Sequence, residues 1–317
     1  MPLKPTHLSY GDTVGVVAPA SAPANPKNIG LALGALERLG FKAKPATNLC
    51  KRWGFLAGTD EERAADIAEM FTDGTVNGIM CLRGGYGAAR LLPLLDFKVI
   101  RANPKIFVGY SDITSLHCAF LAKAGLVSFH GPMLNSDFLK HNIPDFTRKH
   151  FLRTLMQPSA PGSICQGYKP KTVKVLSPGT ATGRLVGGNI SILCASLATP
   201  YQPSFEGAIL FLEDLDEEPY RFDRMLTQLL NARLLQRLRG IAVGINKNCT
   251  DPKARGSSEY RQTLEDVLKE RLLPLNIPIV AGLPFGHVRH NATLPVGARA
   301  ILDAQNGDLV ISEAAVQ

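Results

Sequence analysis

The sequence lacks several patterns that mark common classes of protein. Its six cysteines form no Cys-x-x-Cys pair and no zinc-binding spacing, so we expect reduced thiols, mostly buried, and no metal site. No apolar run approaches the length of a membrane span, and the N-terminal residues include no signal-peptide core. Lys and Arg are scattered, with no long basic run and no nucleic-acid motif. We therefore expect a cytoplasmic protein that contacts neither membrane nor nucleic acid.

The composition is that of a globular protein with two domains. The chain has 317 residues, of which 45% are hydrophobic and 20% charged, enough for a large buried core. Its net charge of +8 is compatible with anionic small substrates without requiring them. The segment 157–172 is rich in Pro, Gly and Ser. It predicts a linker between an N-terminal domain at 1–156 and a C-terminal domain at 173–317.

Strand and helix patterns alternate along the first half of the chain. Short apolar strands are expected near 13–18, 41–45, 78–82, 105–108 and 127–129, with amphipathic helices between them. Thr59 and Glu62 have the spacing of a capping box for a helix to about Phe71. The second half is mixed, with expected paired strands at 172–175 and 180–185, a helix at 258–272 and a final hairpin at 300–312. The fold class is therefore α/β.

Ser111 occupies the most informative position, where the strand 105–108 turns into a helix. A serine there can act as a nucleophile, because the following helix directs free N–H groups and its positive dipole end toward a developing oxyanion. The same position also suits a helix N-cap, for which serine is a preferred residue. The surrounding residues do not match the Gly-x-Ser-x-Gly pattern.

A glycine-rich loop, Arg83 to Gly87, follows another predicted strand. Such a loop lets the backbone approach a ligand and present N–H groups to an anion. It has neither the dinucleotide-binding nor the P-loop glycine spacing, and a plain tight turn explains it equally well.

Glu213 and His287 also follow buried strands. Serine, histidine and a carboxylate are the groups needed for a nucleophile that an oriented imidazole activates. The acids from Glu213 to Glu218 also suit a solvated loop, and Asp214 is the nearest rival to Glu213, since neighbouring side chains on a strand point to opposite faces. His130, which precedes Gly-Pro, suits either a site or a structural role.

Six short motifs, each present once, are spread along the chain between about residues 10 and 305. They are Leu-Ala-Gly-x-Asp-Glu-x-Arg at 56–63, Arg-Gly-Gly-Tyr-Gly at 83–87, Gly-Tyr-Ser-Asp at 109–112, Gly-Arg-Leu-x-Gly-Gly-Asn at 183–189, Leu-Glu-Asp and Pro-Tyr-Arg within 212–221, and Gly-His before Leu-Pro-x-Gly within 286–297. In these motifs the sequence resembles the LD-carboxypeptidase family, which includes murein tetrapeptide carboxypeptidases and microcin C immunity peptidases.

The resemblance implies a flavodoxin-like N-terminal domain with the nucleophile and a swivelling C-terminal α/β domain. Ser111 is then the nucleophile, His287 the general base and acid, and Glu213 the orienting carboxylate. The backbone N–H groups of Asp112 and of a loop glycine, Gly85 or its neighbour Gly84, bind the oxyanion.

The implied reaction releases terminal D-alanine from a murein tetrapeptide, without metal or cofactor, as part of cell-wall recycling. Its partner is this small peptide, and a homodimer is compatible with the assignment. The intact Arg-Gly-Gly-Tyr-Gly loop and the Pro-Tyr-Arg segment resemble the cell-wall branch more than the microcin branch. Two alternatives remain open: cleavage of a microcin-like aminoacyl nucleotide, and a muropeptide- or nucleotide-binding protein without catalysis.

Overall fold

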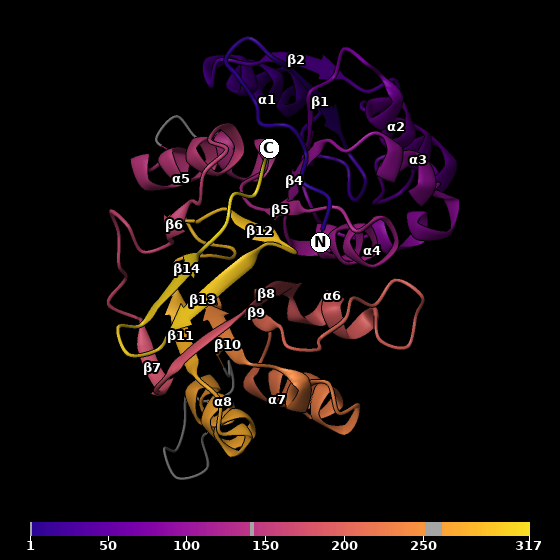
Figure 1. The fold of residues 1–317 in the computed structure, drawn as a ribbon. Coiled ribbons are helices and arrows are strands. Elements are labelled where there is room, and N and C mark those ends of the chain that lie inside the picture. The colour runs from indigo at the N-terminus through magenta and orange to yellow at the C-terminus, as the bar shows by residue number, and fades with distance from the viewer. Residues whose placement is uncertain (1, 140–142, 251–261) are drawn as a thin grey trace.

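The computed structural model describes residues 2–139, 143–250 and 262–317. It contains two sheets, each covered by helices, which form two lobes (Figure 1). The first lobe is the six-stranded sheet with its helices, and the second lobe is the eight-stranded sheet with its helices. Among the described residues, no helix has the length and apolar character needed to traverse a bilayer.

The sheet of the first lobe has the strand order β12-β5-β4-β3-β1-β2. Its strands β1 to β5 are parallel, and β12 pairs with β5 in the antiparallel sense. The order of the parallel strands is that of flavodoxin-like folds, in which the direction of winding reverses between β1 and β3. The strands are β1 (Thr13–Val17), β2 (Lys42–Pro45), β3 (Gly78–Cys81), β4 (Ile106–Gly109), β5 (Ser128–His130) and β12 (Leu294–Val296).

Helices cover both faces of this sheet, because alternate strand residues enter two separate apolar clusters. Val16 packs with helices α1 and α5 on one face, and Val17 packs with α2 and α4 on the other. The capping box expected from Thr59 and Glu62 is present at the start of α2. The helices are α1 (Lys27–Arg38), α2 (Asp60–Thr72), η1 (Ala88–Leu94), α3 (Phe97–Ala102), η2 (Ser111–Ile113), α4 (Thr114–Ala119), η3 (Phe120–Ala124), η4 (Leu134–Phe138) and α5 (Asp145–Met156).

The sheet of the second lobe has the order β6-β14-β13-β8-β9-β10-β11-β7, with β8 to β11 parallel at its centre. Helices α6, α7 and α8 pack on one face. The strands are β6 (Gly162–Ser163), β7 (Lys174–Ser177), β8 (Thr180–Asn189), β9 (Ile209–Glu213), β10 (Gly240–Gly244), β11 (Ile279–Leu283), β13 (Arg299–Asp303) and β14 (Asp308–Ile311). The helices are α6 (Ile190–Ala195), α7 (Pro219–Asn231), η5 (Leu235–Arg237), α8 (Leu264–Leu272) and η7 (Leu273–Leu275).

The expected pairing of the strands at 172–175 and 180–185 is wrong. β7 pairs with β11 at one edge of the sheet, whereas β8 pairs with β9 and β13 near the centre. β8 carries alternating buried residues that fill the core between its parallel neighbour β9 and its antiparallel neighbour β13, while β7 is largely exposed, so burial and not the short connection decides the partners. The expected helix at 258–272 is found as α8, and its predicted start at 258–261 lies outside the described residues.

The two lobes are linked by more than one crossing of the chain. β12 belongs to the first sheet although the strands before and after it belong to the second. The C-terminus also returns to the first lobe, where Val316 is buried and the N–H of Gln317 donates to the carbonyl of Pro5 at 2.9 Å. The segment 157–172 contains β6, which pairs with β14. The division at this segment stays a prediction.

Candidate active site

The turn after β4 places Ser111 in a strained backbone conformation. Its φ of +65° lies in the left-handed region, which residues other than glycine seldom adopt. A serine held in this way on a strand-to-helix turn is the hallmark of a nucleophile elbow. Ser111 is the first residue of η2, and the N-cap positions of η2 and α4 are Tyr110 and Ile113. The N-cap interpretation of Ser111 therefore has no support in the geometry.

Asp112 fastens this turn to the neighbouring loop. Its carboxylate accepts a hydrogen bond from the N–H of Ala88 at 2.8 Å. Burial raises the pKa of Asp112 to about 6, although the Ala88 N–H and the nearby charge of Arg63 act in the opposite direction. The side chain of Asp112 thus links the turn after β4 to the end of the loop after β3. Its backbone N–H lies in the first turn of η2.

The glycine-rich loop after β3 lies directly against Ser111. A Cβ atom on Gly84 would come within 3.3 Å of Ser111 Oγ and 3.0 Å of its Cβ. The carbonyl of Gly84 accepts a hydrogen bond from Arg83 Nε at 3.2 Å. In a trans peptide the carbonyl of one residue and the N–H of the next point in opposite directions. Because the Gly84 carbonyl points toward Arg83, the N–H of Gly85 is directed away from it. Within the described ranges this N–H has no hydrogen-bond partner, which leaves it free to bind an anion.

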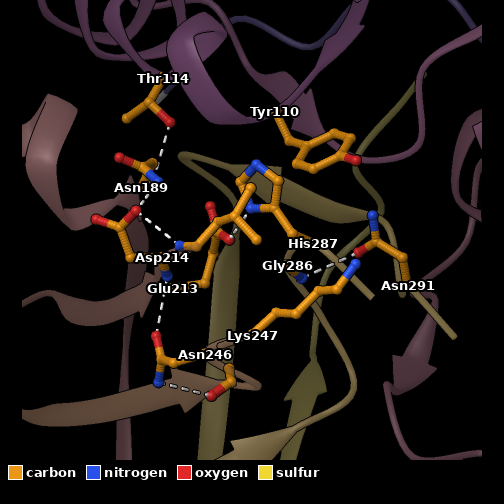
Figure 2. A network of polar contacts seen from close by, with 12 residues as sticks. Tyr110, Thr114, Asn189, Glu213, Asp214, Asn246, Lys247, Gly286, His287 and Asn291 are labelled. Carbon is orange, nitrogen blue, oxygen red and sulfur yellow. Dashed lines mark hydrogen bonds and ion pairs between the residues drawn. The ribbon is translucent and has the colours of Figure 1, made fainter. Parts of the chain in front are cut away.

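Glu213 and His287 form the second half of the site. Glu213 ends β9 and is fully buried, and its Oε2 lies 2.7 Å from Nδ1 of His287 (Figure 2). A Cβ atom on Gly286, where φ is +110°, would lie 2.9 Å from the same oxygen, so glycine is needed for the histidine loop to come this close. Burial lowers the pKa of His287, but the hydrogen bond and charge of Glu213 outweigh it and leave this pKa above its usual value.

Asp214 faces away from the histidine. It accepts a hydrogen bond from Asn189 Nδ2 at 2.7 Å (Figure 2). It also accepts one from Ser191 Oγ at 2.6 Å. Asn189 in turn donates its backbone N–H to Thr114 Oγ1 at 3.0 Å, which joins the second lobe to α4, the helix after the turn at Ser111. The strand alternation therefore assigns Glu213 to the imidazole and Asp214 to the lobe contact.

Tyr110 lies between the two halves of the site, a contact that the sequence did not reveal. Its ring centroid is 4.8 Å from that of His287, in an edge-on arrangement, and 5.8 Å from that of His130. His130 is fully buried behind Tyr110, and burial lowers its pKa well below the usual value. The Gly-Tyr-Ser-Asp motif includes Tyr110, but only the folded chain shows that this ring packs on the imidazole.

The fold thus brings Ser111, Asp112, Gly84 and Gly85 together on one lobe and Glu213 and His287 on the other. No hydrogen bond joins Ser111 Oγ to His287 within the ranges that the structure describes, and such contacts are often long before substrate binds. The arrangement holds a serine hydroxyl, an imidazole bonded to a carboxylate, and backbone N–H groups without partners in the described ranges. These are the components of acyl transfer.

The residues described in the structure contain no group of three or more His, Cys, Asp or Glu side chains arranged to hold a metal ion. His290, three positions after His287, instead stacks on Tyr168 with ring centroids 3.9 Å apart. The two rings therefore have different partners: His287 is bonded to Glu213, and His290 packs on an aromatic ring.

Two family models match the chain. Residues 14–131 match the LD-carboxypeptidase N-terminal domain, and residues 182–302 match the LD-carboxypeptidase C-terminal domain. The "Probable murein peptide carboxypeptidase" of Bacillus subtilis is 41% identical over 97% of this chain and 94% of its own length.

Solved structures share the whole fold. A muramoyltetrapeptide carboxypeptidase from Oxalobacter formigenes superposes with a TM-score of 0.83 at 34% identity, covering 95% of this chain and 99% of its own. The microcin C7 self-immunity protein MccF superposes with a TM-score of 0.88 at 28% identity, covering all of both chains. The MccF sequence from Escherichia coli is 30% identical over 98% of this chain and 96% of its own length.

Proposed function

The chain belongs to the LD-carboxypeptidase family, and on this premise we propose that it is a serine carboxypeptidase of muropeptides. Its substrate is the tetrapeptide stem, from which it releases the terminal D-alanine in cell-wall recycling. The relatives named murein peptide carboxypeptidase and muramoyltetrapeptide carboxypeptidase support this substrate class. A cytoplasmic location and a homodimer belong to the same proposal, and fractionation and light scattering test them.

The reaction begins with attack of Ser111 Oγ on the carbonyl carbon before D-alanine. Nε2 of His287 accepts the serine proton and then donates it to the leaving amine, so the C–N bond breaks and an acyl-enzyme forms. Water, deprotonated by the same imidazole, then attacks the ester and restores Ser111. Glu213, bonded to Nδ1, keeps the imidazole in the required tautomer and stabilises its protonated form.

The oxyanion of the tetrahedral intermediate is bound by backbone N–H groups of Gly85 and Asp112. The close approach of Gly84 to Ser111 and the uncommitted N–H of Gly85 support this assignment. Removing one such donor from a serine hydrolase typically lowers kcat about 10²- to 10³-fold.

One observation carries the proposal: a fully buried carboxylate, Glu213, is bonded to His287, whose ring packs against the residue preceding the strained Ser111. A buried carboxylate with an imidazole is expected where a nucleophile must be activated. Incubation with a murein tetrapeptide should release D-alanine, and a serine-directed phosphonate should label Ser111 alone. Absence of both would contradict the proposal.

The likeness to MccF supports a second candidate, cleavage of a microcin-like aminoacyl nucleotide. Structures of that protein hold aspartyl sulfamoyl adenosine and glutamyl sulfamoyl guanosine. A side-by-side assay of a free tetrapeptide, a disaccharide-tetrapeptide and an aminoacyl adenylate separates the two activities. A chain that binds muropeptides but is neither labelled nor active would be a binding protein.

A further inference from the structure

The winding of the first sheet reverses between two neighbouring parallel strands. In open parallel sheets, ligands bind outside the carboxyl ends of the two strands at this point. Here those strands are β1 and β3. The chain after β1 carries Ser21 and Ala22, and the chain after β3 carries Arg83 and Gly84. The two segments touch, since the N–H of Tyr86 donates to Ser21 Oγ at 3.1 Å.

Arg83 bridges the segments that follow β1 and β3. Its Nε donates to the carbonyl of Gly84 at 3.2 Å, and its Nη1 donates to the carbonyl of Ala22 at 3.3 Å, so the half-buried guanidinium is held by both strand ends. A guanidinium has five N–H donors in a planar fork. These two hydrogen bonds leave three of its donors unused.

No carboxylate neutralises Arg83 among the residues that the structure describes. Two other arginines of the same region differ in this respect, because Arg63 and Arg90 both pair with Asp60. A fixed, half-buried cation with free donors and no acid partner is suited to an anionic ligand.

The loop that carries Arg83 also lies against Ser111. Gly84, whose carbonyl accepts from Arg83, is so near that a Cβ atom added to it would lie 3.3 Å from Ser111 Oγ. A carboxypeptidase cuts the last peptide bond, so the substrate's free carboxylate lies only one residue beyond the carbonyl that the serine attacks. A carboxylate-binding group must therefore lie near Ser111 on the leaving-group side.

We propose that Arg83 binds the α-carboxylate of the terminal residue that the enzyme releases. The inference rests on the proposed carboxypeptidase function and names the group that restricts it to the free C-terminus. The planar guanidinium binds both carboxylate oxygens through parallel N–H···O bonds, and its two carbonyl tethers fix the fork before substrate arrives.

Lys247 is the rival cation at the site. Figure 2 shows its side chain extending from the second lobe toward the loop that carries Gly286 and Asn291. It is exposed, and its side chain has no tether in the described part of the chain, so its ammonium is less fixed than the Arg83 fork. A direct comparison of the two cations decides between them.

The test compares a tetrapeptide ending in D-alanine with the same peptide ending in D-alanine amide. For the wild type, kcat/KM should be roughly 10- to 100-fold higher for the acid, the usual range for hydrogen bonds to a charged group. Arg83→Gln should abolish this preference, and Arg83→Lys should restore part of it. Product release is measured by mass spectrometry, and phosphonate labelling of Ser111 verifies that each variant keeps its nucleophile.

Arg101→Gln is the matched control, because Arg101 also donates to a backbone carbonyl, that of Ala124, but lies in α3, just before the opposite end of β4. It should keep the wild-type ratio of acid to amide. If Arg83→Gln lowers the rate for the acid and the amide equally, the cause is a changed orientation of the Gly84 carbonyl, to which Arg83 donates. Only a change in the acid-to-amide ratio reports carboxylate binding.

If the wild type is active and Arg83→Gln keeps its acid-to-amide ratio of kcat/KM, this inference alone is overturned. If that ratio is lost in Lys247→Met instead, Lys247 and not Arg83 binds the carboxylate. A wild type that releases neither D-alanine nor its amide would overturn the proposed function together with the inference.

Discussion

Glu213 Oε2 lies 2.7 Å from His287 Nδ1, and the two residues come from strand β9 and from the loop after β11. The carboxylate of this pair is fully buried, and the imidazole is 14% exposed. The next acid, Asp214, is bonded to Asn189 and Ser191 and faces the other way. Of the two neighbouring carboxylates, only Glu213 is therefore bonded to the imidazole.

Glu213→Gln should lower kcat by about 10⁴-fold, the loss that the corresponding amide substitution causes in chymotrypsin. The amide keeps the shape but removes the charge that fixes the tautomer. Steady-state D-alanine release measures the effect, and Glu218→Gln, at an acid that caps α7 without a side-chain bond, should stay near wild type. If Asp214→Asn were instead the crippling change and Glu213→Gln the mild one, Asp214 would be the working acid.

Ser111→Ala should abolish turnover and phosphonate labelling while the protein still folds. Ser111→Gly should be equally inactive but more stable than Ser111→Ala by about 1 kcal/mol, because glycine adopts a φ of +65° without strain. Thermal unfolding followed by circular dichroism measures the difference. Ser204→Ala, at an exposed serine of the second lobe, serves as the active control. Residual turnover in Ser111→Gly would refute the nucleophile assignment.

The pH profile of kcat/KM should show an acid limb governed by His287. The base must be neutral, and its pKa lies above 6.5 because Glu213 outweighs the effect of burial, so activity should rise with pH through a midpoint above that value. The same raised pKa means that the ion pair stabilises the fold at low pH and that this stability is lost as pH rises through the folded-state pKa. Glu213→Gln should move the limb to lower pH; an unmoved limb would point to another base.

Asp112 should make the fold less stable as pH rises. Its folded-state pKa of about 6 exceeds the usual 3.8, so the folded state binds the proton more tightly, and stability falls between pH 4 and 6. The whole effect is about 3 kcal/mol at most. Asp112→Asn, which can still accept from Ala88, should remove this pH dependence in urea unfolding. A variant with the same slope as wild type would contradict the assignment.

Chelation should leave the activity intact, because the proposed reaction activates the serine through an imidazole and binds the oxyanion with backbone N–H groups. The measurement is D-alanine release before and after dialysis against EDTA. Loss of activity that zinc restores would replace the serine mechanism with a metal-dependent one.

Much of the site is encoded locally in the sequence. The capping box at Thr59, the strand-to-helix turn at Ser111 and the positions of Glu213 and His287 after apolar strands all follow from short-range patterns. Such patterns depend on backbone propensities and side-chain periodicity within a few residues, so the sequence alone determines them. The same patterns led to the α/β class, whereas the flavodoxin-like first lobe was implied by the family resemblance.

The remaining features depend on contacts between distant segments. The choice of Glu213 over Asp214, the packing of Tyr110 on His287 and the separation of β7 from β8 were decided only when the sheets formed. Arg83 is similar: its loop is visible in the sequence, but its carbonyl partner at Ala22 lies 61 positions away. The sequence determines which local structures form, whereas burial and hydrogen bonding between lobes and strands determine which side chains meet, because those energies arise only in the assembled core.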